Sequence, residues 1–284
     1  MRIAIIGDIH IRDKDNTVRS RIDNYLETCL RKLETIADKH DYVIILGDVF
    51  HKHVVPIETI NTIFYRLNKY KDKLYTILGN HDAFYRTENL DKTAIGLLSN
   101  MGIFKIVTDT FQIGDESFDV VSVVPKLEKP KNLSKYLLGH CYFEKTENTE
   151  SIKESLRYPD LECCDYKYVF LGHEHTPMEP IKIGDTTLIR NGSLTRNDSS
   201  DYNLRRTEIY YSVLENGELT IEVLNVEAPE LVFSPDEFNK PKKLDNKYNL
   251  ENLSKFITNF GKKIDDDDKS TGRVLKTLNT PQTC

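Results

Sequence analysis

The chain has 284 residues, of which 39% are hydrophobic and 30% are charged, and its formal net charge is −6 at pH 7. This balance is typical of a globular protein and excludes global disorder and a fibrous repeat, while the length suits one large domain with or without an appendage. No stretch approaches the roughly 18 apolar residues of a membrane span, and Asp8 interrupts the N-terminal apolar run too early for a signal peptide, so we expect a cytoplasmic protein.

The first half of the chain predicts alternating strands and helices. Apolar runs at 2–7, 42–46 and 74–78 are typical of buried strands. Between them, apolar residues recur at helical spacing over 16–40 and 56–70, and Pro56 suits the first residue of a helix. Near-continuous apolar strands joined by helices indicate a parallel sheet that is covered on both faces.

The second half predicts more strands with shorter connections. The expected strands are 111–113, 117–124, 133–138, 167–171, 181–183, 187–190, 207–214 and 219–226. Asn216-Gly217 between the last two is a strong hairpin signal. We expect this half to be mainly antiparallel, and the chain to form a four-layer α/β/β/α sandwich in which two sheets pack together with helices outside.

The composition changes after Val226. Prolines interrupt a polar stretch there, and apolar residues at helical spacing over 244–260 predict a helix. We therefore expect a domain at 1–226 and a linker with a short C-terminal helical extension at 227–284. The predicted helix could dock on a partner or pack on the chain's own core, and the sequence leaves both alternatives open.

Metal-binding side chains follow the apolar runs at five places. The segments are Gly7-Asp8-Ile9-His10, Gly47-Asp48-Val49-Phe50-His51, Gly79-Asn80-His81-Asp82, Gly139-His140 and Gly172-His173-Glu174-His175. One such segment could be only a turn or a helix cap. Ligands gather at the carboxyl ends of strands in open α/β sheets, so five such endings predict one shared site.

The residue types at these endings fit a centre for two divalent metal ions. Aspartate, asparagine and histidine offer oxygen and nitrogen donors that suit Mn²⁺, Zn²⁺ or Fe²⁺ better than Ca²⁺. If one carboxylate bridges, the set can hold two ions roughly 3.5–4 Å apart, an arrangement that clamps and hydrolyses phosphate esters.

In this order, the five segments resemble the signature of the calcineurin-like metallophosphoesterase superfamily, over roughly residues 1–226. The ligands that the resemblance implies for one metal are Asp8, His10, Asp48 and His175. Those implied for the second metal are the bridging Asp48 with Asn80, His140 and His173. The resemblance also implies that His81 lies beside the metals and stabilises the transition state or protonates the leaving oxygen, with its neighbour Asp82 as a supporting partner.

His51 points to one branch of this superfamily. Ser/Thr protein phosphatases carry GDxxDRG at the second motif, whereas His51 and Lys52 replace the second Asp and the Arg here. A GDxFH motif followed by a proline-initiated helix is similar to the SbcD-like DNA repair nucleases, in which the extra histidine helps to place the DNA phosphate. The segment 191–196 is a partial match to that branch, because Asn191 stands where Pro is usual.

The resemblance implies a Mn²⁺-dependent DNA nuclease of a recombination or repair complex, with exonuclease and endonuclease activity. The implied partners are DNA and an SbcC-like SMC-type ATPase subunit, with a homodimer left open and no membrane. A full DNA-binding cap does not fit within 227–284, so the chain resembles the compact subunits of phage or viral systems, which act in the host cytoplasm.

Two alternatives stay open. A phosphoesterase for a small substrate, such as a cyclic-nucleotide phosphodiesterase or a phosphatase, would keep the chemistry and change the substrate. The negative net charge offers little general attraction for DNA, and this is consistent with a small substrate. A metal-free scaffold of the same fold would bind partners only, but it would need none of the seven metal-binding side chains.

Overall fold

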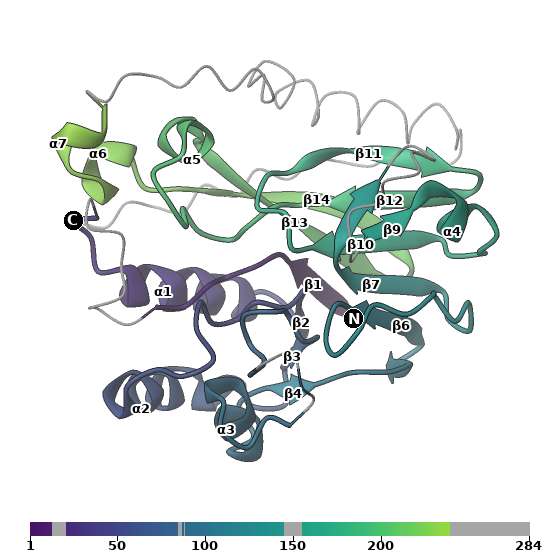
Figure 1. Cartoon of the computed structure of the whole chain (residues 1–284), viewed down its shortest axis with the longest axis horizontal. Helices are drawn as coiled ribbons and strands as arrows, with labels where there is room; N and C mark the ends of the chain where they lie inside the picture. Colours follow the sequence, from purple (N-terminus) through teal and green to yellow (C-terminus); the bar gives the residue numbers. More distant parts are fainter. Residues whose placement is uncertain (13–20, 85–86, 88, 145–154, 239–284) are drawn as a thin grey trace.

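The computed structural model describes residues 1–12, 21–84, 87, 89–144 and 155–238 (Figure 1). One sheet is built from strands near both ends of this part of the chain. In spatial order its strands are β14 (Glu218–Asn225), β13 (Glu208–Glu215), β1 (Arg2–Ile6), β2 (Tyr42–Ile45), β3 (Leu74–Thr76) and β4 (Lys105–Ile106). The parallel pairing predicted for β1, β2 and β3 is confirmed, and the predicted hairpin β13–β14 extends the sheet beside β1.

The second sheet is parallel at its centre. Its strands in order are β11 (Met178–Ile183), β12 (Thr186–Arg190), β10 (Tyr168–Gly172), β7 (Tyr136–His140), β6 (Glu116–Ser122) and β5 (Phe111–Ile113). Only the edge pairs are antiparallel, so the expectation of a mainly antiparallel second half is wrong for this sheet. The connections 123–135 and 141–167 are long enough for the crossovers that parallel pairs need. β7 and β10 are buried along their whole length, as parallel strands usually are.

Helices cover the outer face of the first sheet (Figure 1). They are α1 (Tyr25–Ala37), α2 (Ile57–Leu67) and α3 (Ala94–Asn100), with a 3-10 turn at Asn68–Tyr70 after α2. The helix predicted over 16–40 begins only at Tyr25, because the side chain of Asn24 caps it by accepting from Glu27 N. Residues 13–20 of that prediction lie outside the described residues.

Alternate residues of β1 contribute to different parts of the core. Ile3 and Ile5 belong to the cluster between the two sheets, whereas Ala4 and Ile6 pack with the helices. Among the described residues, the outer cover of the second sheet comprises β8 (Tyr142–Glu144), β9 (Ser155–Arg157) and α4 (Tyr158–Glu162). The two packed sheets and their outer covers agree with the predicted α/β/β/α sandwich.

The chain after β14 returns along α1. Glu227 forms ion pairs with Arg31 and Lys32, and Ile22 N donates to Val232 O at 2.9 Å. The short helices in this region are α5 (Asp201–Arg205), α6 (Pro229–Val232) and α7 (Pro235–Phe238). The boundary expected at residue 226 stays a prediction, and the helix predicted over 244–260 lies outside the described residues. Among the residues that are described, no helix is long and apolar enough to span a membrane.

Candidate metal centre

The side chains predicted as metal ligands lie together where five strands end. They follow β1, β2, β3 and β10 or, for His140, end β7. In three groups, one donor atom from each residue lies within 4.8 Å of the others: Asp8, His10 and His175; Asp48, His140 and His173; His10, His51 and His81. The first two groups divide the predicted ligands as the resemblance implies. The third brings together two of the predicted catalytic histidines with one predicted ligand.

Asp48 lies between the first two groups. Its Oδ2 is 3.4 Å from His10 Nε2 in one group and 3.5 Å from His140 Nε2 in the other. The side chain is buried, so solvent does not separate it from either imidazole. This position is the one that a bridging carboxylate requires, because each of its lone pairs can face a different cation.

The nitrogen atoms of these groups are crowded. His10 Nε2 lies 2.8 Å from His175 Nε2, and His140 Nε2 lies 3.2 Å from His173 Nδ1 and 3.1 Å from the Oδ1 atom of Asn80. Lone pairs at such distances repel each other unless a proton or a cation lies between them. The donor set therefore fits a metal ion at each group.

Hydrogen bonds to backbone carbonyls fix two of the ring tautomers. His140 Nδ1 lies 2.6 Å from Leu46 O, and His81 Nδ1 lies 2.8 Å from His51 O. A carbonyl oxygen only accepts, so in both rings Nδ1 carries the hydrogen and donates it. Once His140 loses its second proton, Nε2 has a lone pair that faces the site, which is the usual arrangement of a metal-binding histidine.

Burial favours the neutral form of three of the histidines. It lowers the pKa of His10 well below its usual value, and it lowers the pKa of His51 and of His173 to about 4 each. His140 differs: burial lowers its pKa, but the neighbouring Asp48 carboxylate outweighs burial and raises it to about 9. In turn, burial raises the pKa of Asp48, and His140 brings it down well below the usual range. A cation entering here displaces the proton of His140.

The backbone of three candidate ligands is strained. His10, Asp48 and His173 have φ values of 54°, 48° and 79°, in the left-handed region that residues with a side chain rarely adopt. The turn that carries Asp48 also needs a glycine opposite it. A Cβ on Gly79 would lie 2.1 Å from Asp48 Oδ1, so no other residue fits there.

The predicted catalytic residues surround the same centre. His81 stacks on His51 with ring centroids 5.1 Å apart, and its backbone N–H donates to Asp48 Oδ1 at 2.9 Å. Asp82 is fully buried beneath them, which raises its pKa to about 7. Its carboxylate accepts from three backbone amides, those of Val49 (3.3 Å), Phe50 (3.0 Å) and Gly79 (3.2 Å). Asp82 therefore joins the turns after β2 and β3, which is a positioning role.

The loop after β12 forms hydrogen bonds with the backbone of two candidate ligands. Leu194 N donates to Asp8 O at 2.8 Å, and Ser193 N donates to His175 O at 2.9 Å. The side-chain amide of Asn191 donates to Ile5 O and to Ser212 Oγ. A proline at this position would lack that amide, so the departure from the expected motif has a structural reason. The sequence marked this segment only as a partial motif and assigned its residues no role.

Two further residues at the centre carried no sequence signal. The ring of Tyr142 meets the ring of His173 edge to face, with centroids 4.2 Å apart. Arg190 forms an ion pair with Glu174 and donates to Thr176 O at 3.0 Å, which holds the turn that carries His175. Neither residue lies in a recognisable motif, so only the fold could reveal them.

Residues 1–177 match the family model described as calcineurin-like phosphoesterase. No curated protein matches the chain. The solved structure of TT1561 of Thermus thermophilus is 15% identical, with a TM-score of 0.47, and the alignment covers 80% of this chain and 99% of that one. A second solved crystal structure is 10% identical with a TM-score of 0.45, and the same shares of the two chains are covered.

Proposed function

The chain belongs to the calcineurin-like phosphoesterase family, and we propose that it is a two-metal nuclease that hydrolyses the phosphodiester bonds of DNA. Membership of the family makes it a phosphoester hydrolase. The observation that carries the finer proposal is the position of Asp48 between two donor groups, with His51 stacked on His81 beside them. An imidazole at position 51, where phosphatases have an acid, supports a diester as the substrate.

We propose ligands for the two ions from the positions of the donor atoms. Asp8, His10 and His175 would hold one ion, Asn80, His140 and His173 would hold the other, and Asp48 would contact both. When bound, the two cations would stabilise the negative charge that builds on the phosphoryl oxygens during hydrolysis. We propose Mn²⁺ because the set mixes carboxylate and imidazole donors.

The histidines beside the ligands would act on the substrate. Because His81 Nδ1 donates to His51 O, the Nε2 atom of His81 remains to contact a phosphoryl or leaving oxygen. The backbone carbonyl of His51 thus fixes the orientation of the His81 ring. The side chain of His51 is half-buried, and its ring stacks on the ring of His81. We propose that His51 contacts the diester phosphate and that His81, protonated at both ring nitrogens, gives its Nε2 proton to the leaving oxygen and keeps the Nδ1 hydrogen bond to His51 O.

The wider role is a further part of the proposal. We propose that the chain acts in the cytoplasm, or in the host cytoplasm for a viral protein, in DNA recombination or repair. Its proposed partner is an SbcC-like SMC-type ATPase, and a second copy of the chain is the alternative. Large apolar side chains on α2 and α3 support a partner surface, since Tyr65 is 80% exposed and Leu97 is 42% exposed.

An assay on three substrates tests the proposal. Protein purified without chelator is given Mn²⁺ with linear duplex DNA, circular single-stranded DNA or bis-p-nitrophenyl phosphate. We expect cleavage of both DNA substrates and slower cleavage of the small diester. Cleavage of small substrates alone would support the small-substrate alternative, and purified protein without bound metal or activity would support the scaffold.

The variant that tests the bridging role in this assay is Asp48→Asn, and its control is Asp185→Asn. The asparagine keeps an acceptor for the backbone N–H of His81 but removes the charge that two cations would share. We expect bound metal to fall at both positions and cleavage of all three substrates to be lost. Asp185→Asn, in an exposed turn far from the centre, should match the wild type. Two ions per chain and normal turnover in Asp48→Asn would contradict the bridging role.

A further inference from the structure

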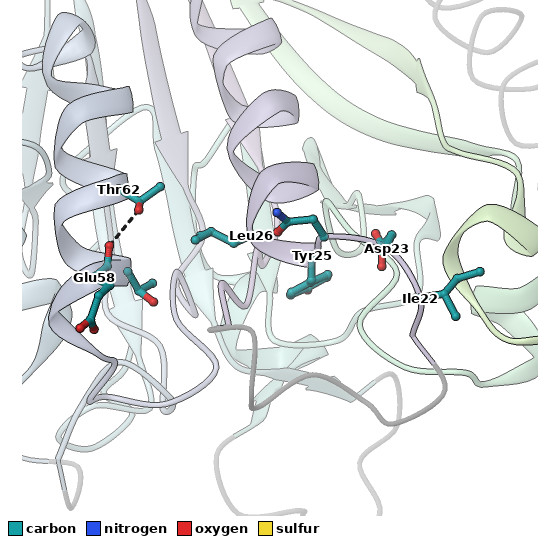
Figure 2. A pocket seen from close by; sticks show the side chains of 8 residues that line it. Ile22, Asp23, Tyr25, Leu26, Glu58 and Thr62 are labelled. Carbon is teal, nitrogen blue, oxygen red and sulfur yellow. Dashed lines mark hydrogen bonds between the residues drawn. The ribbon is translucent and has the colours of Figure 1, made fainter.

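A groove lies between the beginnings of α1 and α2 (Figure 2). Its volume is about 520 Å³, within the roughly 300–1,000 Å³ range of pockets that bind ligands. In Figure 2, Leu26 extends from α1 toward α2, Thr62 and Glu58 face it from α2, and Ile22 lies at the far end.

The groove combines apolar surface with acidic groups. Ile22, which lines the groove, is 59% exposed, so a large apolar side chain there is in contact with water. Among the described residues, the Glu58 carboxylate forms no hydrogen bond or ion pair, whereas Asp23 pairs with Arg21. These side chains suit an occupant that carries both apolar and positively charged groups.

The path of the chain brings its C-terminal part to this groove. Residues 227–233 run along α1 in the opposite direction, from the ion pair of Glu227 with Lys32 to the hydrogen bond of Ile22 N with Val232 O. Arg21 and Phe233 then form an isolated antiparallel bridge. The chain therefore leaves α1 beside Ile22, a residue that lines the groove.

The residues that follow have the required character. Lysines at 240, 242, 243 and 247 precede the apolar positions Leu250, Leu253, Phe256, Ile257 and Phe260. The twelve residues that follow Phe238, up to Leu250, can span up to about 40 Å when extended, so the groove is within reach. We propose that residues 244–260 of this chain dock in the groove between α1 and α2, with apolar side chains near Leu26 and with Lys247 and the lysines that precede the segment near Glu58.

Hydrogen exchange on the full chain, followed by mass spectrometry, tests this docking. We expect the amides of residues 250–260 to exchange more slowly than in the free peptide, by on the order of tenfold or more. Ile22→Asp and Thr62→Arg alter exposed side chains of the groove and should return these amides to the rate of the free peptide. Leu133→Asp, at a 73% exposed apolar residue outside the groove, is the matched control and should change nothing.

The reverse substitution completes the test. Phe256→Asp combined with Ile257→Asp should speed exchange at the first turn of α1 and leave the second sheet unchanged. Exchange of 250–260 at the rate of the free peptide in the wild type would overturn the proposal. Protection that survives both groove substitutions, that increases with chain concentration or that appears only with an added ATPase would also overturn it, because the segment would then dock elsewhere, on a second copy or on a partner.

Discussion

Three candidate metal ligands have backbone conformations that each cost on the order of 1–3 kcal/mol. His10, Asp48 and His173 persist in them because their turns hold one another. His10 N donates to Asp48 O at 2.9 Å, and His173 N donates to both carboxylate oxygens of Asp8 at 3.1 Å. The same bonds that offset the strain also point the ligands at a common centre, so the donor groups are in place before a cation arrives.

His81→Ala should separate catalysis from metal binding. His81 Nδ1 is occupied by His51 O, and the ring stacks on His51 rather than completing either of the two ligand groups that contain Asp8 or Asp48. We expect bound metal to stay at the wild-type level while turnover falls on the order of 10²–10⁴-fold, the usual contribution of general-acid catalysis. Metal analysis and steady-state rates measure the two effects. A loss of bound metal would make His81 a ligand, and His53→Ala, in the loop between β2 and α2, is the control.

His51→Ala should distinguish a long substrate from a small one. A small activated diester needs only the metals, whereas a duplex end must be positioned so that its scissile phosphate reaches them. We expect cleavage of duplex ends to fall on the order of 10²-fold, the cost of misplacing a substrate, with smaller loss on bis-p-nitrophenyl phosphate and unchanged bound metal. The net charge of −6 provides little general attraction as a substitute, so the loss should persist at low salt. An equal loss on both substrates would place His51 in the chemistry itself.

The residues of the centre could be predicted from sequence because each follows a glycine at the end of an apolar strand. Parallel strands bring such endings to one edge, so Asp8, Asp48 and His140 meet without any long-range signal in the sequence. The supporting contacts could not be predicted, since they depend on which loops lie side by side. The contacts of Asn191 and Tyr142 arise because the loop after β12 and the strand β8 lie beside the centre.

At the scale of elements, apolar runs located most of the strands but did not give their direction. The hairpin at Asn216-Gly217 was predictable because the turn residues determine the pairing. The parallel pairing of β6, β7 and β10 was not, because the sequence between these strands does not carry the long run of apolar residues at helical spacing that marks the crossovers of the first sheet. Whether these strands pair in parallel depends on the burial of both faces of their sheet, and that burial is a property of the whole sandwich.

One buried carboxylate joins several elements of the second sheet. Asp119 on β6 is fully buried and accepts hydrogen bonds from Thr110, Leu133, Ser134 and Tyr166, at 2.6–2.8 Å. Burial raises the pKa of Asp119, but the bond from Tyr166 and the other donors outweigh burial and lower the pKa below its usual 3.8. The charged form is thus more stable in the folded chain than in the unfolded chain.

The stability that this carboxylate provides should depend on pH. Because the folded pKa is depressed, the contribution is complete above the unfolded pKa, near 4, and is lost as pH falls through the folded pKa. Asp119→Asn should lower the free energy of unfolding by about 2–4 kcal/mol at pH 7, and the difference from the wild type should shrink below pH 4. Urea unfolding at pH 7, 5 and 3.5 measures it. Thr110→Val, which removes one donor, should cost less, and a pH-independent difference would contradict the assignment.

At the scale of the molecule, the centre joins the two sheets. Asp8, Asp48 and Asn80 follow strands of the first sheet, whereas His140 and His173 come from strands of the second. Each proposed ion would therefore take ligands from both sheets, and its binding would favour their packed arrangement. The position of the site between the sheets also explains why no single segment of sequence contains it.

The strap along α1, residues 227–233, decides where the folded unit ends. Lys32 is buried and pairs with Glu227 at 3.0 Å, and burial lowers its pKa to about 8 even with that partner. Val232 and Phe233 are buried as well, and the Arg21 guanidinium lies over the Phe233 ring at 5.4 Å. Removal of the strap would leave a buried amine without its carboxylate and expose part of the core.

Two truncations should therefore behave differently. A chain that ends at Val226 loses the strap and its buried aromatic ring, and removal of one buried Phe side chain alone costs about 3–5 kcal/mol. We expect this chain to be insoluble or to unfold at a much lower temperature. A chain that ends at Phe238 keeps the strap, so it should stay folded, bind metal and cleave bis-p-nitrophenyl phosphate at the wild-type rate. Thermal unfolding and the diester assay measure both. Equal stability of the two truncated chains would show that the strap contributes nothing to the fold, and inactivity of the longer one would place residues 239–284 in the catalytic unit.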